Sequence, residues 1–444
     1  MRTPALLLSL ACTLGQTGQA QGLVELFDAA RGYDAGVLSA RRAQDAAMAR
    51  AAQADAGLLP NVAFATGVSA SQQDNQGTPY LPEQNFNYQT QTAGVTATQP
   101  LYRPANRLQR EQGERQIDVA AVQLRAAEQD LLLRLSQAYF DVLAASDSLD
   151  FTQSQKRAVG EQLASAQRNF ELGSATIVDT RDAQARYDLV LAQELATQNA
   201  LRVKSLALEQ LVGRDQVSAW PLRSPTQLPA LLPDKADAWV LLAQDNSPAL
   251  RQLELGVRVA ELETAKAQAA GAPTLDLVGS YNASNALQGS SNGPANFDAS
   301  SKVASLGLSL NFPLYNGRAV ENRVRETLAL EDKARSDLLA MRRNVAQATR
   351  SAFYDAQSGL AQVHALEAAE VSSAVALQAN LLGYQVGIKI NIDVLNAQSQ
   401  LYDTKAKLAR ARYDVLMAGL HLRQTSGTLQ ADDLLPIEAL LTPR

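Results

Sequence analysis

The sequence has very little of the residues from which most active sites and metal sites are built. Its 444 residues include one Cys and two His, which leaves almost nothing for a zinc site or for a Cys–His catalytic pair. The net charge of −5, without any block of Lys or Arg, excludes a typical nucleic-acid-binding protein, because such proteins carry clustered positive charge. These absences predict a protein that is not an enzyme and that uses no metal and no cofactor.

Proline is missing from two long stretches. No proline falls between Pro104 and Pro221, and none falls between Pro313 and Pro436. Because proline breaks helices, both stretches are free to form long ones.

The first proline-free stretch carries the pattern of a coiled coil. Nothing interrupts a helix from Pro104 to Phe170, which would be about 100 Å long at about 1.5 Å per residue. Apolar residues recur every seven positions, and only Glu128 breaks this seam. An ordinary intracellular coiled coil is one interpretation, but it explains neither the N-terminal segment nor the strands described below.

The sequence also lacks any internal apolar run as long as the roughly eighteen residues of a membrane-spanning helix. The N-terminus instead has a positive start, a short apolar run at 5–14 and small residues at Gly18 and Ala20. These features predict a signal peptide over residues 1–20, with a buried N-terminal helix as the alternative. Cys12 raises the option of lipidation, which its preceding residues fit poorly. The protein is therefore predicted to be exported, and strands must make any membrane crossing.

The sequence repeats itself at a fixed distance. Gly173 recurs as Gly387, 214 residues further on, and Ala-Tyr-Phe-Asp at 138–141 recurs as Ala-Phe-Tyr-Asp at 352–355. A tandem duplication is therefore predicted. Its predicted segments are a signal peptide (1–20), a first repeat (21–213), a Pro-rich linker (214–247), a second repeat (248–427) and a C-terminal tail (428–444).

Each repeat contains two stretches in which large apolar residues alternate with small or polar ones. Such alternation is typical of a strand with one apolar face. The predicted strands are about 61–71 and 86–99 in the first repeat, and about 274–284 and 302–312 in the second. The polar segments between them, 72–85 and 285–300, are expected to be hairpin loops. Each repeat then continues into a long helical hairpin, with turns predicted near 173 and 387.

Four strands are too few to close a barrel, and an open sheet edge in lipid would leave backbone groups unpaired. The residues therefore predict that several copies of the chain each donate four strands to one barrel, while the same symmetry closes the helices into a tube. Three copies would give twelve strands, although the sequence does not fix the number. The predicted fold is mainly α, with a long coiled-coil tunnel and a membrane β-barrel portion.

Four segments carry specific motifs: Leu-Tyr-Arg-Pro-Ala-Asn-Arg at 101–107, Ala-Tyr-Phe-Asp at 138–141, and the turns at 170–179 and 384–395. Together they resemble the TolC-like outer membrane factors of Gram-negative export systems, and the resemblance covers nearly the whole mature chain. It implies a trimer with a twelve-stranded barrel in the lipid of the outer membrane and a helical tunnel across the periplasm.

The resemblance also implies partners. These are a periplasmic adaptor protein and an inner-membrane transporter, either an ABC transporter or a proton-driven one. The motif at 101–107 looks most like that of members serving type I protein secretion, and small-molecule efflux is the alternative. The channel is expected to be a passive exit duct.

The same resemblance implies which residues control the channel. In the family the periplasmic end closes like an iris, with acidic side chains around the constriction. By motif, Asp393 falls on the first ring position. Asn396 falls on the second, where the missing carboxylate should weaken the negative ring. Tyr384 and Lys389 match the residues that make the closing links, and Asp179 matches their acidic partner.

Two features of this site depart from the family or have another explanation. Val178 stands where a hydroxyl partner is usual, so the Lys389 link is expected to be missing or rerouted. Helix capping is the alternative role for both aspartates, because each lies in the first turn of a helix. Gly173 and Gly387 are the expected hairpin tips for adaptor docking, although ending a helix in a left-handed conformation would also explain them.

Two other classes of protein fit the sequence less well. For an enzyme, His364 and His421 lack suitable partners, and Glu367 and Glu370 have the spacing of an exposed helix face. A trimeric coiled-coil surface stalk or adhesin would also carry a signal peptide. It would have strands only at its C-terminus, however, and not a pair in each repeat.

Overall fold

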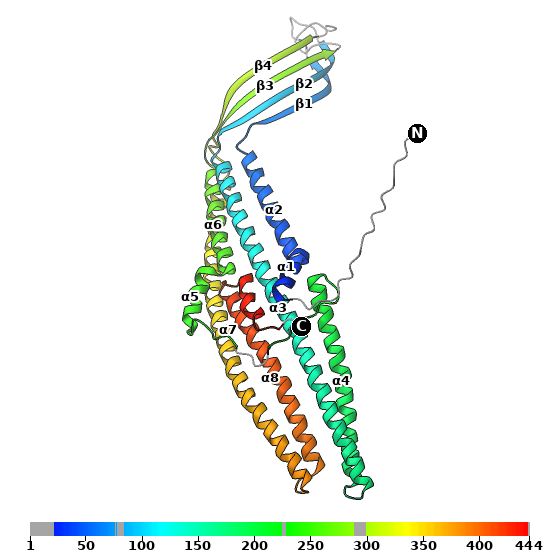
Figure 1. Cartoon of the computed structure of the whole chain (residues 1–444). Coiled ribbons are helices and arrows are strands. Elements are labelled where there is room, and N and C mark those ends of the chain that lie inside the picture. Colours follow the sequence, from blue (N-terminus) through cyan, green and yellow to red (C-terminus); the bar gives the residue numbers. More distant parts are fainter. Residues whose placement is uncertain (1–21, 76, 78–83, 224–227, 288–298, 443–444) are drawn as a thin grey trace, which may run out of the picture. The chain divides into compact units, whose positions relative to one another are not determined.

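The computed structural model describes most of the chain (Figure 1). The chain divides into two compact units. The described residues are 22–75, 77, 84–223, 228–287 and 299–442. The predicted signal peptide and most of the two predicted hairpin loops lie outside them. Unit 1 contains residues 1–41, 123–251 and 341–444, and unit 2 contains residues 42–122 and 252–340.

The same order of elements, with two helices, two strands and two long helices, occurs twice along the chain. The first set is α1 (Leu23–Tyr33), α2 (Ala35–Ala56), β1 (Asn61–Asn75), β2 (Gln84–Tyr102), α3 (Pro104–Glu171) and α4 (Ile177–Val212). The second set is α5 (Ala236–Asn246), α6 (Pro248–Ala269), β3 (Thr274–Leu287), β4 (Ala299–Asn311), α7 (Ala319–Gln385) and α8 (Asn391–Thr425). A 3-10 turn (Ala431–Asp433) and α9 (Leu434–Glu438) follow.

Proline and glycine mark the ends of the helices. Pro104 and Pro248 are the first residues of α3 and α6, where the missing N–H of proline has no helical partner to lose. Gly213 follows α4 with a left-handed φ of 72°, which ends the helix. The long helix α3 continues through Glu128, whose carboxylate accepts a hydrogen bond from Arg31 at 2.6 Å. Among the described helices, none combines the length and apolar character needed to cross a membrane.

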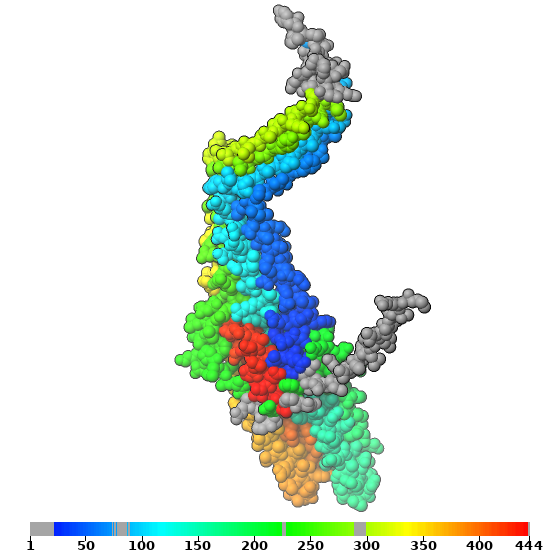
Figure 2. Space-filling view, turned by 45° about the horizontal axis from the view of Figure 1, so that its top comes forward, coloured from blue at the N-terminus to red at the C-terminus, as the bar shows by residue number. Residues whose placement is uncertain are grey.

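The four strands of unit 2 form one antiparallel sheet in the order β1-β2-β3-β4. Each repeat supplies one hairpin, and the hairpins join through β2 and β3, with Thr96 opposite Ser280 and Gly94 opposite Asn282. Figure 2 shows the strands of the two repeats lying side by side in one continuous surface. The two outer strands, β1 and β4, each have one neighbour within this sheet.

The observed strands run further than the alternation of apolar residues indicates. β1 continues to Asn75, where Asp74 pairs with Asn85 of β2, and β3 continues to Leu287. At its other end β2 reaches Tyr102 through a register shift after Pro100. Backbone hydrogen bonds hold these extensions, and such bonds do not need an apolar side chain. The sequence pattern therefore underestimates the length of the strands.

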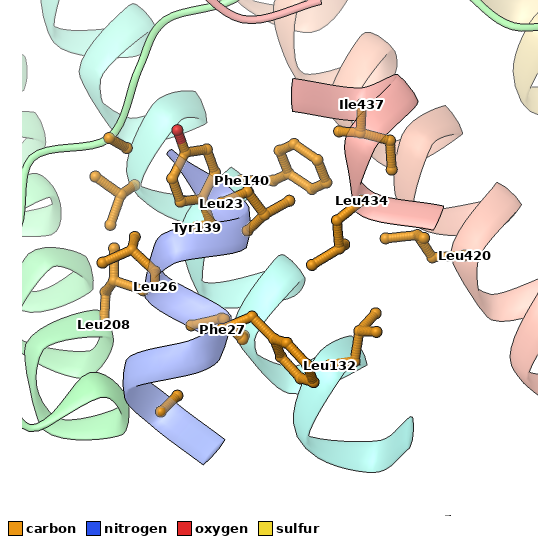
Figure 3. Close-up of a cluster of buried hydrophobic side chains, with 14 of the residues drawn as sticks. Leu23, Leu26, Phe27, Leu132, Tyr139, Phe140, Leu208, Leu420, Leu434 and Ile437 are labelled. Atoms are coloured by element: carbon orange, nitrogen blue, oxygen red, sulfur yellow. The ribbon is translucent and has the colours of Figure 1, made fainter. Parts of the chain in front are cut away.

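The main core of unit 1 collects side chains from both repeats. Figure 3 shows the side chains of α1, α3, α4, α8 and α9 meeting there, and the labelled residues are Leu23, Leu26, Phe27, Leu132, Tyr139, Phe140, Leu208, Leu420, Leu434 and Ile437. The hydroxyl of Tyr139 accepts a hydrogen bond from the backbone N–H of Trp220 at 2.7 Å, and burial raises the pKa of this phenol. Tyr139 and Phe140 are fully buried. The motif at 138–141 is thus explained by packing.

The Pro-rich segment between the repeats is held to the C-terminal tail. Arg223 donates its backbone N–H to the carbonyl of Leu440 at 2.9 Å, and Leu222 forms a β-bridge with Leu441. Further along, the indole N–H of Trp239 on α5 donates to the carbonyl of Pro233 at 2.8 Å. These contacts fix the described part of the segment against the core of unit 1.

Candidate functional site: the hairpin ends and the exposed sheet

The first hairpin, α3 and α4, turns at Gly173. This glycine has a φ of 72°, and Ser174 donates its backbone N–H to the carbonyl of Asn169 at 2.8 Å, which closes the last turn of α3. Thr176 then caps α4 by accepting from the N–H of Asp179, while the carboxylate of Asp179 accepts from both the N–H and the hydroxyl of Thr176. This is a complete capping box. The carboxylate of Asp179 is therefore engaged within its own turn.

The second hairpin, α7 and α8, turns at Gly387 with the same backbone geometry but without a side-chain cap. Gly387 has a φ of 78°, and Ile390 occupies the N-cap position, where its side chain accepts no hydrogen bond. The carboxylate of Asp393 is free of capping and lies 3.5 Å from the ammonium of Lys389. Both side chains are partly exposed, so this ion pair contributes at most about 1 kcal/mol.

The expected closing links join Tyr384 and Lys389 to Asp179, and within one chain these residues make other contacts. Lys389 pairs with Asp393 of its own turn, and Val178 is exposed beside the first turn. The hydroxyl of Tyr384 accepts from the amide of Asn169 at 3.4 Å, which is a weak contact. The links of Tyr384 and Lys389 to Asp179 stay predictions for an assembled channel.

Three polar side chains that the sequence reasoning missed join the two hairpins. Gln162 of α3 donates its side-chain amide to the side-chain oxygen of Asn391 at 2.5 Å. Asn391 in turn donates to the backbone carbonyl of Asp179 at 3.2 Å. Arg186 of α4 donates to the side-chain oxygen of Asn396 at 2.6 Å. The one available signal was the repeat itself, because Asn391 stands where the first repeat has an apolar Ile177.

A groove of about 780 Å³ lies between α3, α4 and α8, next to these contacts. Its walls include Arg186 and Asn396, and the carboxylate of Asp403 in the wall pairs with Lys407 at 2.7 Å. Burial raises the pKa of Tyr402 in the same wall. The groove presents hydrogen-bonding groups and one guanidinium. Within the described ranges, no group of three or more His, Cys, Asp and Glu side chains could hold a metal ion.

Two of the residues considered for catalysis, His364 and Glu367, lie on α7 and make structural contacts. His364 is exposed on α7, and its ring lies 3.6 Å from Glu367. The carboxylate of Glu367 accepts from Arg412 of α8 at 2.9 Å, and this hydrogen bond is the main reason that the pKa of Glu367 is lowered. This arrangement ties two helices together.

The sheet of unit 2 exposes a row of apolar side chains on each outer strand. On β1 the row is Val62, Phe64 and Val68, and on β4 it is Leu306, Leu308 and Leu310; all six are more than 60% exposed. Because alternate residues of a strand share a face, each row lies on one side of the sheet. Such a surface is typical of a strand that faces lipid. Together with long paired helices in each repeat, it defines the subunit of a membrane channel.

Comparison with known proteins identifies the family. A sequence model described as outer membrane efflux protein matches residues 26–214 and again residues 239–428, so the chain is a tandem duplication. The chain belongs to the outer membrane efflux protein family. It is an outer membrane channel of a Gram-negative bacterium, and its family and fold are those of efflux and secretion channels rather than of enzymes.

Individual relatives match along nearly the whole chain. The outer membrane protein TolC of Vibrio cholerae serotype O1 is 30% identical over 429 residues, covering 96% of this chain and 95% of that protein. The proteases secretion protein PrtF of Dickeya chrysanthemi is 29% identical over 455 residues, which cover 99% of this chain and 95% of that protein. Among solved structures, the outer membrane protein VceC of Vibrio cholerae shares the fold, with a TM-score of 0.76 at 17% identity. The superposition covers 91% of this chain and 96% of VceC.

Proposed function

We propose that this protein is the exit duct of a type I protein secretion system, receiving its cargo from an inner-membrane transporter through a periplasmic adaptor. The observation that carries the proposal is the end-to-end likeness to a relative named for the secretion of proteases. The motif at 101–107 supports it, and Arg103 of this motif forms two hydrogen bonds to Asp276 of β3, at 2.8 and 2.6 Å.

Three copies of the chain would form the channel. The sheet has two outer strands that lack a second neighbour among the described strands, and a lipid environment does not tolerate open edges. Pairing β4 of one copy with β1 of the next closes twelve strands into a barrel. Apolar side chains that are exposed on α7 in one copy, such as Val371 and Val375, are available for contacts between copies.

The hairpin turns would form the periplasmic mouth. Asp393 would supply the acidic ring, and Asn396, held by Arg186, would leave the second ring without a carboxylate. Tyr384, Lys389 and Asp179 are the proposed closing links between copies.

The hairpin tips around Gly173 and Gly387 are the proposed docking surface for the adaptor. Leu172 and Ile388, which flank these glycines, are about four-fifths exposed. Exposed apolar side chains at such tips suit contact with another protein.

Small-molecule efflux is the second candidate, and the description of the family as efflux proteins favours it. Both functions use the same duct, so the cargo depends on the transporter behind it. A strain that lacks the gene separates the two. Protein secretion predicts the loss of particular proteins from the culture medium with unchanged drug susceptibility, whereas efflux predicts the reverse.

The location and the number of copies need a second experiment. Outer membranes are separated from inner membranes, and cross-linked samples are then analysed for size. The expected product is a trimer in the outer membrane. A soluble monomer would contradict the proposal that the protein forms a trimeric channel.

A further inference from the structure

Strand β3 carries a single charged residue, Asp276, and the neighbouring strand β2 carries none. Asp276 is 8% exposed, so its carboxylate has lost most of its contact with water. Burying a charge costs free energy unless a partner of opposite charge compensates it. The place of that partner therefore bears on how β3 can lie in the sheet.

The partner is Arg103, which lies between the end of β2 and the start of α3. Its Nε donates to Oδ1 of Asp276 at 2.8 Å, and its Nη2 donates to Oδ2 at 2.6 Å. Two hydrogen bonds between a guanidinium and a carboxylate fix both distance and orientation. The pair joins residues 173 positions apart, one from each repeat.

The pairing of β2 with β3, which we call the seam, has a side-chain pattern that specifies its register poorly. Residues 89–99 of β2 are Gln, Thr, Ala and Gly except for Val95, and residues 279–285 of β3 are small or polar except for Tyr281. Register is weakly specified where strands are polar on both faces or rich in glycine. A slip by two residues keeps every side chain on its own face, so this pattern discriminates little against it.

The chain connection does not set the register of the seam either. Within each repeat the two strands are neighbours in sequence, whereas four helices, α3 to α6, separate β2 from β3. The backbone ladder is also interrupted at this end of the seam. Pro100 stands opposite Asp276 and has no N–H to donate, and the register shifts between Pro100 and Tyr102. The ion pair thus lies where the ladder is weakest.

Other polar contacts near this end do not join the two strands. Gln99 donates to the carbonyl of Leu58 at 2.9 Å, within the first repeat. Lys266 of α6 donates to Gln109 of α3 at 3.0 Å and so joins helices. Among the described residues, no second ion pair crosses between β2 and β3, because neither strand has another charged side chain.

We propose that Arg103 and Asp276 are positioning residues that pin the register of the seam and so set how the strands of the two repeats join. A slip by two residues would move β3 along β2 by about 7 Å and would break both hydrogen bonds. It would also change the stagger between β1 and β4, and a barrel closes only with a fixed stagger. This inference concerns the seam within one chain and goes beyond the proposed function, because it holds for any cargo.

The test uses disulfides that form in one register only. In the full-length protein with Cys12→Ser, Thr96→Cys with Ser280→Cys reports the observed register, because these residues are directly opposite. Thr96→Cys with Asn282→Cys and Thr96→Cys with Val278→Cys report slips by two residues in the two directions, because both pairs are diagonal in the observed register and too far apart. Outer membranes are oxidised and digested, and mass spectrometry measures the three products.

Each pin variant is combined with the three cysteine pairs. Arg103→Ala should raise the ratio of slipped to in-register product by about tenfold, which corresponds to about 1.4 kcal/mol. Arg103→Lys keeps the charge but loses the fork of two donors, so it should raise the ratio less.

A double variant separates register from folding. Arg103→Ala leaves a buried carboxylate without its partner, which can also destabilise the protein. Arg103→Leu with Asp276→Leu removes both charges, and such replacements of buried ion pairs often keep a protein stable. The double variant should therefore reach the outer membrane in normal amounts and still show the rise in slipped product.

The matched control is Arg110→Ala, which removes another arginine ion pair of unit 2. Arg110 of α3 lies 3.0 Å from Asp55 of α2, and both side chains are about half exposed. This pair joins two helices of the first repeat and does not touch the seam. The control should keep the wild-type ratio of products.

The ratios are measured without any transport assay, so they do not depend on the outcome of the secretion experiment. A wild-type ratio in the double leucine variant would overturn the pin, and so would an equal rise in Arg110→Ala. A wild-type protein that yields mainly slipped product would overturn the observed seam itself. Loss of the proposed secretion function with these ratios as expected would leave the pin in place.

Discussion

The two hairpins turn on equivalent glycines but begin their second helices in different ways. In the first repeat Thr176 and Asp179 form a capping box, whereas in the second repeat Ile390 replaces the threonine and cannot cap. The equivalent carboxylate, that of Asp393, is therefore free to pair with Lys389. One substitution three residues before an aspartate therefore decides whether its carboxylate caps the helix or pairs with a lysine.

The repeats also differ in what they bury. The aromatic pair of the first repeat, Tyr139 and Phe140, lies wholly inside the core of unit 1. In the second repeat Phe353 is buried against Trp239, but Tyr354 is 58% exposed. The first repeat therefore supplies more of the core of unit 1.

The largest expected effect concerns the feature that the repeats share. Gly173→Ala and Gly387→Ala each place a side chain in a left-handed conformation, which costs about 1–2 kcal/mol. An added Cβ meets no atom within 4 Å at either site, so the cost comes from the backbone alone. Hydrogen exchange of the turn amides should accelerate to a similar extent in both variants. A large effect at one site only would show that the turns are not equivalent.

A smaller effect should distinguish the repeats. Thr176→Ala removes the cap of α4 and is expected to lower local stability by about 1 kcal/mol, or about fivefold in the exchange of the first-turn amides. Ile390→Ala removes no cap and serves as the control. Equal acceleration in both variants would contradict the assignment of the capping box.

The converse substitution should make the second turn resemble the first. Ile390→Thr places a hydroxyl three residues before Asp393, which is the spacing of the box at Thr176. We expect hydrogen exchange of the backbone amides at the start of α8 to slow down, because the new cap should raise local stability by about 0.5 kcal/mol. Asp393 should then leave Lys389, and the lysine ammonium resonance in NMR spectra would report this. An unchanged lysine environment would mean that the box does not form.

The smallest effect is a difference in pH response at the start of the repeats. Burial raises the pKa of Asp34, but hydrogen bonds from Arg134 and from the N–H of Val37 outweigh it, so the pKa lies below its usual 3.8. The stabilisation by Asp34 is therefore fully present above the unfolded pKa and is lost as the pH falls through the lower folded value. Ser247, before α6, does not titrate.

Thermal melts between neutral pH and pH 3 measure this difference. Asp34→Ser should reduce the loss of stability in acid, and Ser247→Ala should leave the pH dependence unchanged. The same acid response in the wild type and in Asp34→Ser would show that Asp34 does not contribute to it.

The features that could be predicted from the sequence, the hairpins and the strands, are those that depend on neighbouring residues in the chain. The proline-free stretches and the two glycines locate the hairpins, and alternation locates the strands to within a few residues, because these features depend on the local chain. Capping was one of two roles left open for Asp179, and the structure shows it. The tie between Gln162 and Asn391 could not be predicted, because its partners are 229 residues apart and pair only after both hairpins have packed.

Asp393, whose carboxylate caps no helix, gives the most direct test of the account, because we propose that it lies at the channel mouth. The measurement is the reversal potential of the purified channel in a salt gradient across a planar bilayer, for the wild type, Asp393→Ala and Asp179→Ala. The account predicts that Asp393→Ala loses preference for cations, whereas Asp179→Ala, whose carboxylate is engaged in capping, keeps it. An Asp393→Ala channel with unchanged current and selectivity would contradict the account.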